Sequence, residues 1–171
     1  IKTIACKYAD VVISDNKGIQ DFVKLTYNRD SSLIAYGGDH VLMDMLPEHQ
    51  VSILNKYNVN KSEYAISVCR IEPENNCHII LEAFAKSSID LVYIGNWERS
   101  EYGKQLKQKY SSYSNIHILD PIYDLEILYA LRNNAKLYVF GHSVGGTNPY
   151  LVEAMFFGLP NVFYDVVHNQ D

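Results

Sequence analysis

The sequence predicts an α/β fold, in which a parallel sheet carries helices on both faces. Beyond about residue 63, short apolar runs typical of buried strands alternate with amphipathic helical patterns. Nearly continuous apolar strands indicate a parallel sheet that is covered on both sides. Strand–helix alternation of this kind predicts a doubly wound, Rossmann-like sheet, with ligands at the carboxyl ends of its strands.

Five strands and four helices are expected in this part of the chain. The strands are predicted at 64–68, 90–94, 115–119, 136–140 and 161–164. The helices between them are predicted at 76–86, 98–110, 124–133 and 149–157. In the first helix, the expected buried face consists of Ile79, Ile80, Ala83 and Phe84. Gly158 should end the last helix, because glycine favours the left-handed conformation past a helix C-terminus.

The first 40 residues predict a smaller unit of the same kind. The pattern indicates a helix end at 1–8, a strand at 10–14, a helix at 17–27 and a strand at 32–36. Because so few elements do not form a stable domain alone, we expect residues 1–40 to be the trailing βαβ part of an N-terminal domain. Residues 41–62, with a helix at 48–57, are then a connecting element. Residues 63–171 form the main domain, which is expected to be incomplete at its C-terminus.

Composition excludes several classes of protein. The formal net charge is −5, which argues against nucleic-acid binding. No apolar run approaches the roughly 18 residues of a membrane span. The three cysteines lack a Cys-x-x-Cys spacing and are expected to be reduced core residues. Histidine and carboxylate residues show no metal-ligand spacing, so we expect neither a metal nor a cofactor.

The stretch GHSVGGTNPYLVEAMFFGLP, at 141–160, carries the strongest functional signal. A strand, a glycine loop and a helix N-terminus in succession are typical of phosphate sites, because free N–H groups and the helix dipole converge on an anion. The candidate diphosphate ligands are Gly146, Thr147 and Asn148, with Gly145 as an uncertain member. Alternatively, the loop is a glycine-rich turn that serves chain geometry. The Lys-Ser/Thr pair of a P-loop and the spaced GxGxxG of a dinucleotide site are both absent.

Two charged residues are candidates near the same cleft. Arg70 directly follows the strand at 64–68, where a guanidinium could form forked hydrogen bonds with a diphosphate. Its alternative is a surface salt bridge with Glu72 or Glu74. Glu153 lies one turn into the helix at 149–157, where a carboxylate could accept hydrogen bonds from ribose hydroxyls. Its alternative is a solvated helix position.

Two strand ends supply further candidates. His142 follows the strand at 136–140 and could donate to a phosphate, although a histidine at a strand end can equally be structural. His40 is expected near the hinge between the N-terminal unit and the main domain and is a weaker candidate. Ile122 and Tyr123 follow the strand at 115–119 and could flank a nucleotide base, or belong to a plain turn. No residue is predicted to be a catalytic nucleophile.

With these residues in place, the chain resembles the family 4 retaining glycosyltransferases of the GT-B fold, over their C-terminal, donor-binding domain. The resemblance is carried by CRIEPENN and by NPYLVEAMFFGLP. The strings SDNKGIQDFV, IAYGGDHV and GHSVGGTNPYLVEAM look more narrowly like bacterial rhamnosyltransferase-like enzymes that build capsule or cell-wall polysaccharides.

Residue by residue, the resemblance implies a donor site. It implies diphosphate binding by Arg70 and by the loop from Gly146 to Asn148, and ribose binding by Glu153. Two positions depart from the family pattern. Gly145 stands where the family has its first glutamate, and Asn75 stands where it usually has a lysine.

The implied function is hexosyl transfer with retention from a nucleotide-diphospho-sugar, for which dTDP-rhamnose is the suggested donor. The acceptor is expected to be a glycan or lipid-linked glycan held by the N-terminal domain, so this part alone should be inactive. The full-length protein is expected in the cytoplasm, peripherally bound at the inner face of the bacterial membrane. Two alternatives remain, a non-catalytic nucleotide-sugar binding module and a GT-B sugar-nucleotide epimerase.

Overall fold

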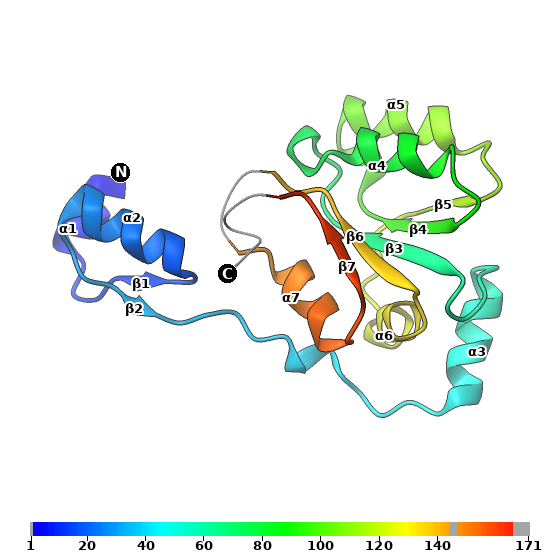
Figure 1. Cartoon of the computed structure of the whole chain (residues 1–171), viewed down its shortest axis with the longest axis horizontal. Coiled ribbons are helices and arrows are strands. Elements are labelled where there is room, and N and C mark those ends of the chain that lie inside the picture. The colour runs from blue at the N-terminus through cyan, green and yellow to red at the C-terminus, as the bar shows by residue number, and fades with distance from the viewer. Residues whose placement is uncertain (1, 144–146, 166–171) are drawn as a thin grey trace.

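The computed structural model describes residues 2–143 and 147–165 and confirms the predicted α/β fold. Its main body is a parallel sheet with the strand order β5-β4-β3-β6-β7 (Figure 1). The five strands are β3 (Tyr64–Val68), β4 (Asp90–Ile94), β5 (Ile116–Leu119), β6 (Leu137–Phe140) and β7 (Asn161–Phe163). From β3 the chain adds β4 and β5 on one side, then returns to add β6 and β7 on the other. The strand order therefore reverses between β3 and β6.

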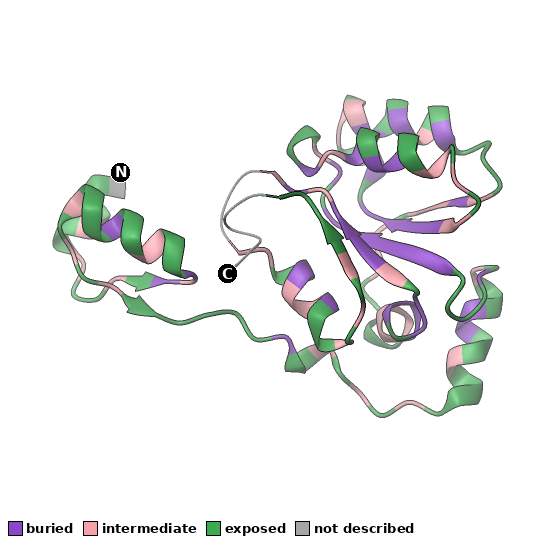
Figure 2. Ribbon diagram, in the orientation of Figure 1, coloured by how far each residue is buried: buried purple, intermediate pink, exposed green. Residues whose placement is uncertain are grey.

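Two hydrophobic cores cover the two faces of this sheet. The helices α4 (Cys77–Phe84) and α5 (Glu101–Tyr110) cover one face; α6 (Leu125–Asn133) and α7 (Pro149–Phe156) cover the other (Figure 1). Strand β3 is buried along its whole length (Figure 2). Its Tyr64, Ile66 and Val68 join the core under α6 and α7, whereas Ala65 joins the core under α4 and α5. This division follows from the alternation of side chains along a strand.

Side-chain caps set where several helices begin. Ser100 caps α5 by accepting from the N–H of Gly103, and Asp124 caps α6 by accepting from two N–H groups of its first turn. The short 3₁₀ turns η2 (Pro73–Asn75) and η3 (Trp97–Arg99) come before α4 and α5. Gly158 has φ +66 just past α7, which confirms the predicted helix end.

The predicted buried face of α4 is right for Ile80, which is buried, and for Phe84, which packs against the core, but wrong for Ile79 and Ala83. Ile79 is 51% exposed and Ala83 is also exposed, whereas Cys77, Ile80 and Leu81 are buried. The helix begins only at Cys77, because Asn76 has a left-handed backbone with φ 49 after the η2 turn. This start turns Cys77 inward and carries Ile79 to the solvent side.

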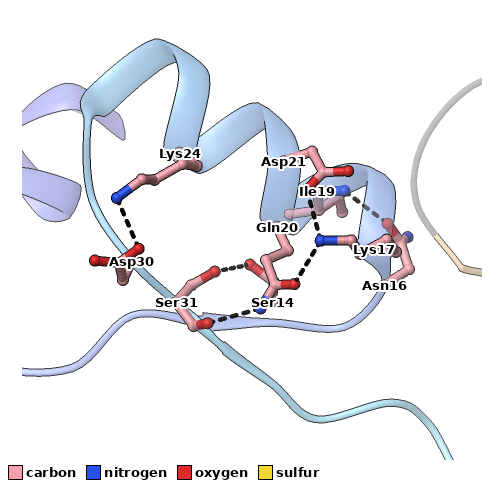
Figure 3. A network of polar contacts seen from close by, with 9 residues as sticks. All are labelled: Ser14, Asn16, Lys17, Ile19, Gln20, Asp21, Lys24, Asp30 and Ser31. Atoms are coloured by element: carbon pink, nitrogen blue, oxygen red, sulfur yellow. Dashed lines mark hydrogen bonds and ion pairs between the residues drawn. The ribbon is translucent and has the colours of Figure 1, made fainter.

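The N-terminal part forms a separate two-stranded parallel sheet. It contains α1 (Lys2–Tyr8), β1 (Ile13–Ser14), α2 (Lys17–Tyr27) and β2 (Ser32–Leu33), and both strands are shorter than predicted. Polar contacts join α2 to the strands, as Figure 3 shows. The Ser14 and Ser31 hydroxyls lie 2.8 Å apart, and Gln20 Nε2 donates to the Ser31 carbonyl at 2.8 Å. Asn16 caps α2 by accepting from the N–H of Ile19.

The segment between the two sheets is partly anchored to the main body. The 3₁₀ turn η1 (Asp39–Val41) lies against α7 (Figure 1). A Cβ at Gly38 would lie 2.5 Å from Cδ2 of Phe156, so a larger residue here would displace the ring of Phe156. The helix α3 (Pro47–Lys56) packs on α6 and contributes Leu54 to the core. The domain boundary at 62–63 stays a prediction. No helix in the described parts of the chain is long and apolar enough to cross a membrane.

Candidate donor-binding site

A cavity of about 390 Å³ lies at the carboxyl ends of the central strands. The segments after β3, β4 and β5 form three of its walls, and α6, α7 and the η1 turn complete it. Strand ends of a doubly wound sheet are where ligands bind, and this cavity adjoins the strand β3 at which the order reverses.

Part of the cavity lining is apolar. Val68 and Ile94 end β3 and β4, and Ile122 and Tyr123 line the wall that follows β5. Tyr123 is 86% exposed, so its ring is available to a ligand. Ile122 also packs against the hydrophobic core. The two residues proposed to flank a base therefore line this cavity.

The lining also contains charged residues, most of them basic. Among the described residues, the lining contains three arginines, Arg70, Arg99 and Arg132, and one carboxylate, Glu153. Arg70 is exposed on the loop after β3 and pairs with Glu72 at 3.3 Å, so the cavity position and the salt bridge considered from the sequence both occur. Arg99 is exposed at the end of η3, and the described residues give it no ion-pair partner within 4 Å.

Glu153 is held rather than solvated. Its side chain is 14% exposed and its Oε2 lies 2.6 Å from Nη2 of Arg132, whose side chain is 4% exposed. The other carboxylate oxygen, Oε1, lies 3.4 Å from Nε2 of His40 on η1. One carboxylate therefore joins α7, α6 and the segment that leads to the N-terminal unit.

His142 and Asn75 form a buried pair behind the cavity wall. Asn75 Nδ2 donates to the carbonyl of Arg70 at 2.6 Å, which leaves its Oδ1 to accept from Nδ1 of His142 at 2.6 Å. The loop after β6 is joined to the loop after β3 again where Asn76 donates to the carbonyl of Gly141. His142 does not line the cavity in the described structure, so its predicted contact with a phosphate stays a prediction.

The glycine loop is only partly described. Gly145 and Gly146 lie outside the described residues. Thr147 accepts a hydrogen bond from Nδ2 of Asn16 at 3.0 Å, and this contact joins the loop to the N-terminal unit. Asn148 caps α7, because its Oδ1 accepts from the N–H of Tyr150 at 3.0 Å. Their predicted contacts with a diphosphate stay predictions.

Three groups near Arg70 have shifted pKa values. A hydrogen bond with Cys77, together with burial, holds the pKa of the Cys69 thiol well above its ordinary value, so Cys69 is a neutral thiol in the cavity wall. The same hydrogen bond lowers the pKa of Cys77. A hydrogen bond from its own backbone N–H lowers the pKa of Glu74, and the charges of Arg70 and His142 lower it further. Glu74 is therefore a carboxylate at neutral pH.

Sequence reasoning missed Arg99 and Arg132 and undervalued His40. Arg99 could have been noticed, because it follows a buried strand as Arg70 does. Arg132 interrupts the apolar pattern of LYALRNNA, and a charge on a buried helix face is a signal for a paired, functional side chain. Within the described ranges, no group of three or more histidine, cysteine or acidic side chains could hold a metal ion.

The comparisons with known proteins agree with the fold. A family model described as "Glycosyl transferases group 1" matches residues 52–170. No curated protein matches the sequence. Among solved structures, the chain is similar to Anabaena HepE in complex with UDP-glucose, with a TM-score of 0.75 at 18% identity over 94% of this chain and 46% of that one.

Two further solved structures share the fold. One is WaaG, a glycosyltransferase involved in lipopolysaccharide biosynthesis, with a TM-score of 0.70 at 15% identity over 92% of this chain and 45% of that one. The other is TarM, with a TM-score of 0.69 at 14% identity over 97% of this chain and 32% of that one. The chain thus spans less than half the length of each of these proteins. The family match covers more than half of the chain and the fold agrees with it, so the chain belongs to the glycosyl transferases group 1 family.

Proposed function

We propose that the cavity binds the nucleoside diphosphate part of a nucleotide sugar, and that the whole protein transfers the sugar to an acceptor. The observation that carries the proposal is the charge of the cavity. Three arginines and one glutamate line it, although the chain as a whole has a net charge of −5. Guanidinium groups stay charged at all relevant pH values and match phosphate oxygens with forked hydrogen bonds, so the cavity favours a phosphorylated anion.

Each wall has a role in this proposal. Arg70 and Arg99 bind the diphosphate from the exposed rim, where an incoming anion meets them first. Glu153 accepts hydrogen bonds from the pentose. Ile122 and Tyr123 pack against the base. Support comes from HepE, which has the same fold and was solved with UDP and with UDP-glucose.

The proposed chemistry is electrostatic. As the bond from the sugar to the diphosphate breaks, negative charge develops on the leaving phosphate, and Arg70 and Arg99 stabilise it from fixed positions. The anomeric carbon becomes oxocarbenium-like, as in glycosyl chemistry generally. The resemblance implies hexosyl transfer with retention of configuration. We assign no residue of this chain as a nucleophile.

The finer assignments rest on the resemblance of GHSVGGTNPYLVEAM to rhamnosyltransferase-like enzymes. We propose dTDP-rhamnose as the donor and a polysaccharide or lipid-linked glycan as the acceptor. The acceptor binds an N-terminal domain at the inner face of the bacterial membrane. This chain alone is then a donor-binding part without transfer activity.

Calorimetric titration of the chain with UDP, dTDP and GDP tests the proposal. We expect saturable binding of one of them, with dTDP favouring the rhamnose donor. Arg70→Ala and Arg99→Ala should each weaken it roughly tenfold or more, because a hydrogen bond to a charged group contributes about 1.5–3 kcal/mol. Lys86→Ala is the matched control, since Lys86 is an exposed cation paired with Glu82 and does not line the cavity. If the folded chain binds no nucleotide, or if all three variants bind alike, the proposal is wrong.

A non-catalytic nucleotide-sugar binding protein is the second candidate. It is favoured by Asn75, which stands where the resembling family has a lysine and whose amide is engaged by His142 and by the Arg70 carbonyl. In that case the full-length protein binds the donor but never releases its nucleoside diphosphate. Measuring donor turnover of the full-length protein with cell-envelope glycans as acceptors distinguishes the two candidates.

A further inference from the structure

Arg132 is a buried cation in the wall of the cavity. Its side chain is 4% exposed on α6, and its Nη2 lies 2.6 Å from Oε2 of Glu153 on α7. An arginine does not lose its proton in a protein, so a buried one needs a partner charge. Within the part of the chain that the structure describes, Arg132 forms its ion pair with Glu153. The sequence alone drew no attention to this pair.

The two oxygens of the Glu153 carboxylate have different surroundings. Oε2 is engaged by Arg132, whereas Oε1 lies 3.4 Å from the exposed His40 at the edge of the cavity. A glutamate side chain has several rotatable bonds, and its freedom must be lost before it can hold a ligand in one geometry. The contact with Arg132 removes that freedom in the free protein. Fixing one oxygen also fixes the direction of the other.

The ion pair of Arg132 with Glu153 is not arranged for greatest stability between α6 and α7. Within the described residues, the buried Nε of Arg132 has no hydrogen-bond partner. A buried donor without an acceptor lowers stability, so a pair selected only for stability would be expected to satisfy it. By contrast, α6 is attached to the sheet by a satisfied contact next to Arg132, where the Tyr64 hydroxyl donates to the Leu131 carbonyl at 2.6 Å.

We propose that Arg132 is a positioning residue, which holds Glu153 so that Oε1 accepts a hydroxyl of the nucleotide pentose. This inference rests on the proposed function, because it needs a nucleotide in the cavity. Arg132 touches the ligand only through Glu153. Its loss therefore removes the recognition of the pentose hydroxyls and leaves the diphosphate contacts of Arg70 and Arg99 in place.

The test compares each nucleotide with its analogue that lacks the pentose hydroxyls. UDP, dTDP and their 2′,3′-dideoxy forms are titrated into the chain, and the ratio of the two dissociation constants measures hydroxyl recognition. For the wild type we expect a ratio of about tenfold or more, as for a hydrogen bond to a charged group. In Arg132→Met the ratio should fall to about twofold or less, while the dideoxy forms keep their wild-type affinity. Arg132→Lys should restore part of the ratio.

Tyr64→Phe is the matched control for a structural role. It removes the hydrogen bond beside Arg132 that attaches α6 to the sheet, but it leaves Glu153 and its partner untouched. We expect it to lower the urea midpoint without changing the ratio. If Tyr64→Phe lowers the ratio as Arg132→Met does, Arg132 acts only through the attachment of α6 and the inference is wrong.

The other outcomes separate the two proposals. A wild type that binds UDP or dTDP without preferring the hydroxylated form overturns the role of Arg132 and leaves the proposed function standing. An unchanged ratio in Arg132→Met also overturns the role of Arg132 and leaves the proposed function standing. If Arg132→Met does not fold, Arg132→Lys decides, and an unchanged ratio there overturns the inference. A wild type that binds neither nucleotide overturns both proposals.

Discussion

Replacing Gly141 by alanine tests how tightly the two loops beside the cavity fit together. Gly141 follows β6, and a Cβ at this position would lie 2.3 Å from the carbonyl oxygen of Asn75 and 3.1 Å from Cδ1 of Ile80. The first contact is with backbone, which cannot rotate away. Gly141 is not among the described residues with a positive φ, so the cost of the substitution is steric and not conformational.

The magnitude follows from what must move. Overpacking of a tight site costs about 1–3 kcal/mol. Separating the loops also weakens the hydrogen bond from Asn76 to the Gly141 carbonyl, at 2.8 Å, which adds about 1 kcal/mol. We therefore expect Gly141→Ala to lower the free energy of unfolding by about 2–4 kcal/mol. For a chain of this size that is a fall in Tm of roughly 5–15 °C.

Urea unfolding followed by circular dichroism measures this change, with Gly158→Ala as the control. A Cβ at Gly158 meets nothing within 4 Å, but its φ of +66 is unfavourable for alanine. That substitution should cost only about 1 kcal/mol. Gly141→Ala should also weaken nucleotide binding, because the displaced loop carries Arg70. The reasoning is refuted if Gly141→Ala is no more destabilising than Gly158→Ala.

Two further predictions concern tyrosines. Burial raises the pKa of Tyr64 and Tyr138 above the ordinary value of 10.0, so only the unfolded chain ionises them readily. Their contribution to stability is then fully present below about pH 10 and is lost as the pH rises further, so the urea midpoint should fall above about pH 10; a flat profile would contradict this. Tyr123→Ala should weaken nucleotide binding about threefold to tenfold by removing a ring from the base wall. It should leave the free energy of unfolding unchanged, because the side chain is exposed. Tyr113→Ala is the control, which should leave nucleotide binding unchanged and alter the free energy of unfolding only slightly.

The sheet could be predicted closely from the sequence, because burial on both faces leaves a clear pattern. The bounds of β3 and β4 agree with the predicted strands, since β4 ends directly before Gly95 and β3 ends two residues before the charged Arg70. The buried face of α4 could be predicted only in part, at Ile80 and Phe84. In CHIILEAF nearly every position is apolar, so periodicity alone does not choose a face, and the left-handed Asn76 that sets the phase has no clear sequence signal.

The site could be predicted only in part, for a related reason. The sequence placed Arg70, Tyr123 and Glu153 at the cleft because each follows a strand or begins a helix at the carboxyl edge of the sheet. It did not reveal that Glu153 pairs with Arg132 and His40. That contact joins three elements far apart in the chain, and the distance between their side chains depends on packing that local patterns do not encode.

The docking of η1 on α7 determines where the N-terminal unit can pivot. Gly38 lies against Phe156 and His40 lies beside Glu153, so residues 38–41 move with the main body, while Ile34 is hydrogen-bonded to Ser14 of the small sheet. Residues 35–37 lie between these two anchors and can serve as a hinge only when the hydrogen bond from Asn16 to Thr147 is broken. Limited proteolysis should therefore cut at 35–37 before it cuts at 38–41. A rotation about this hinge breaks the contact of the small unit with Thr147 but keeps His40 beside Glu153 in the cavity lining. A hinge after residue 41 would instead carry His40 away from Glu153.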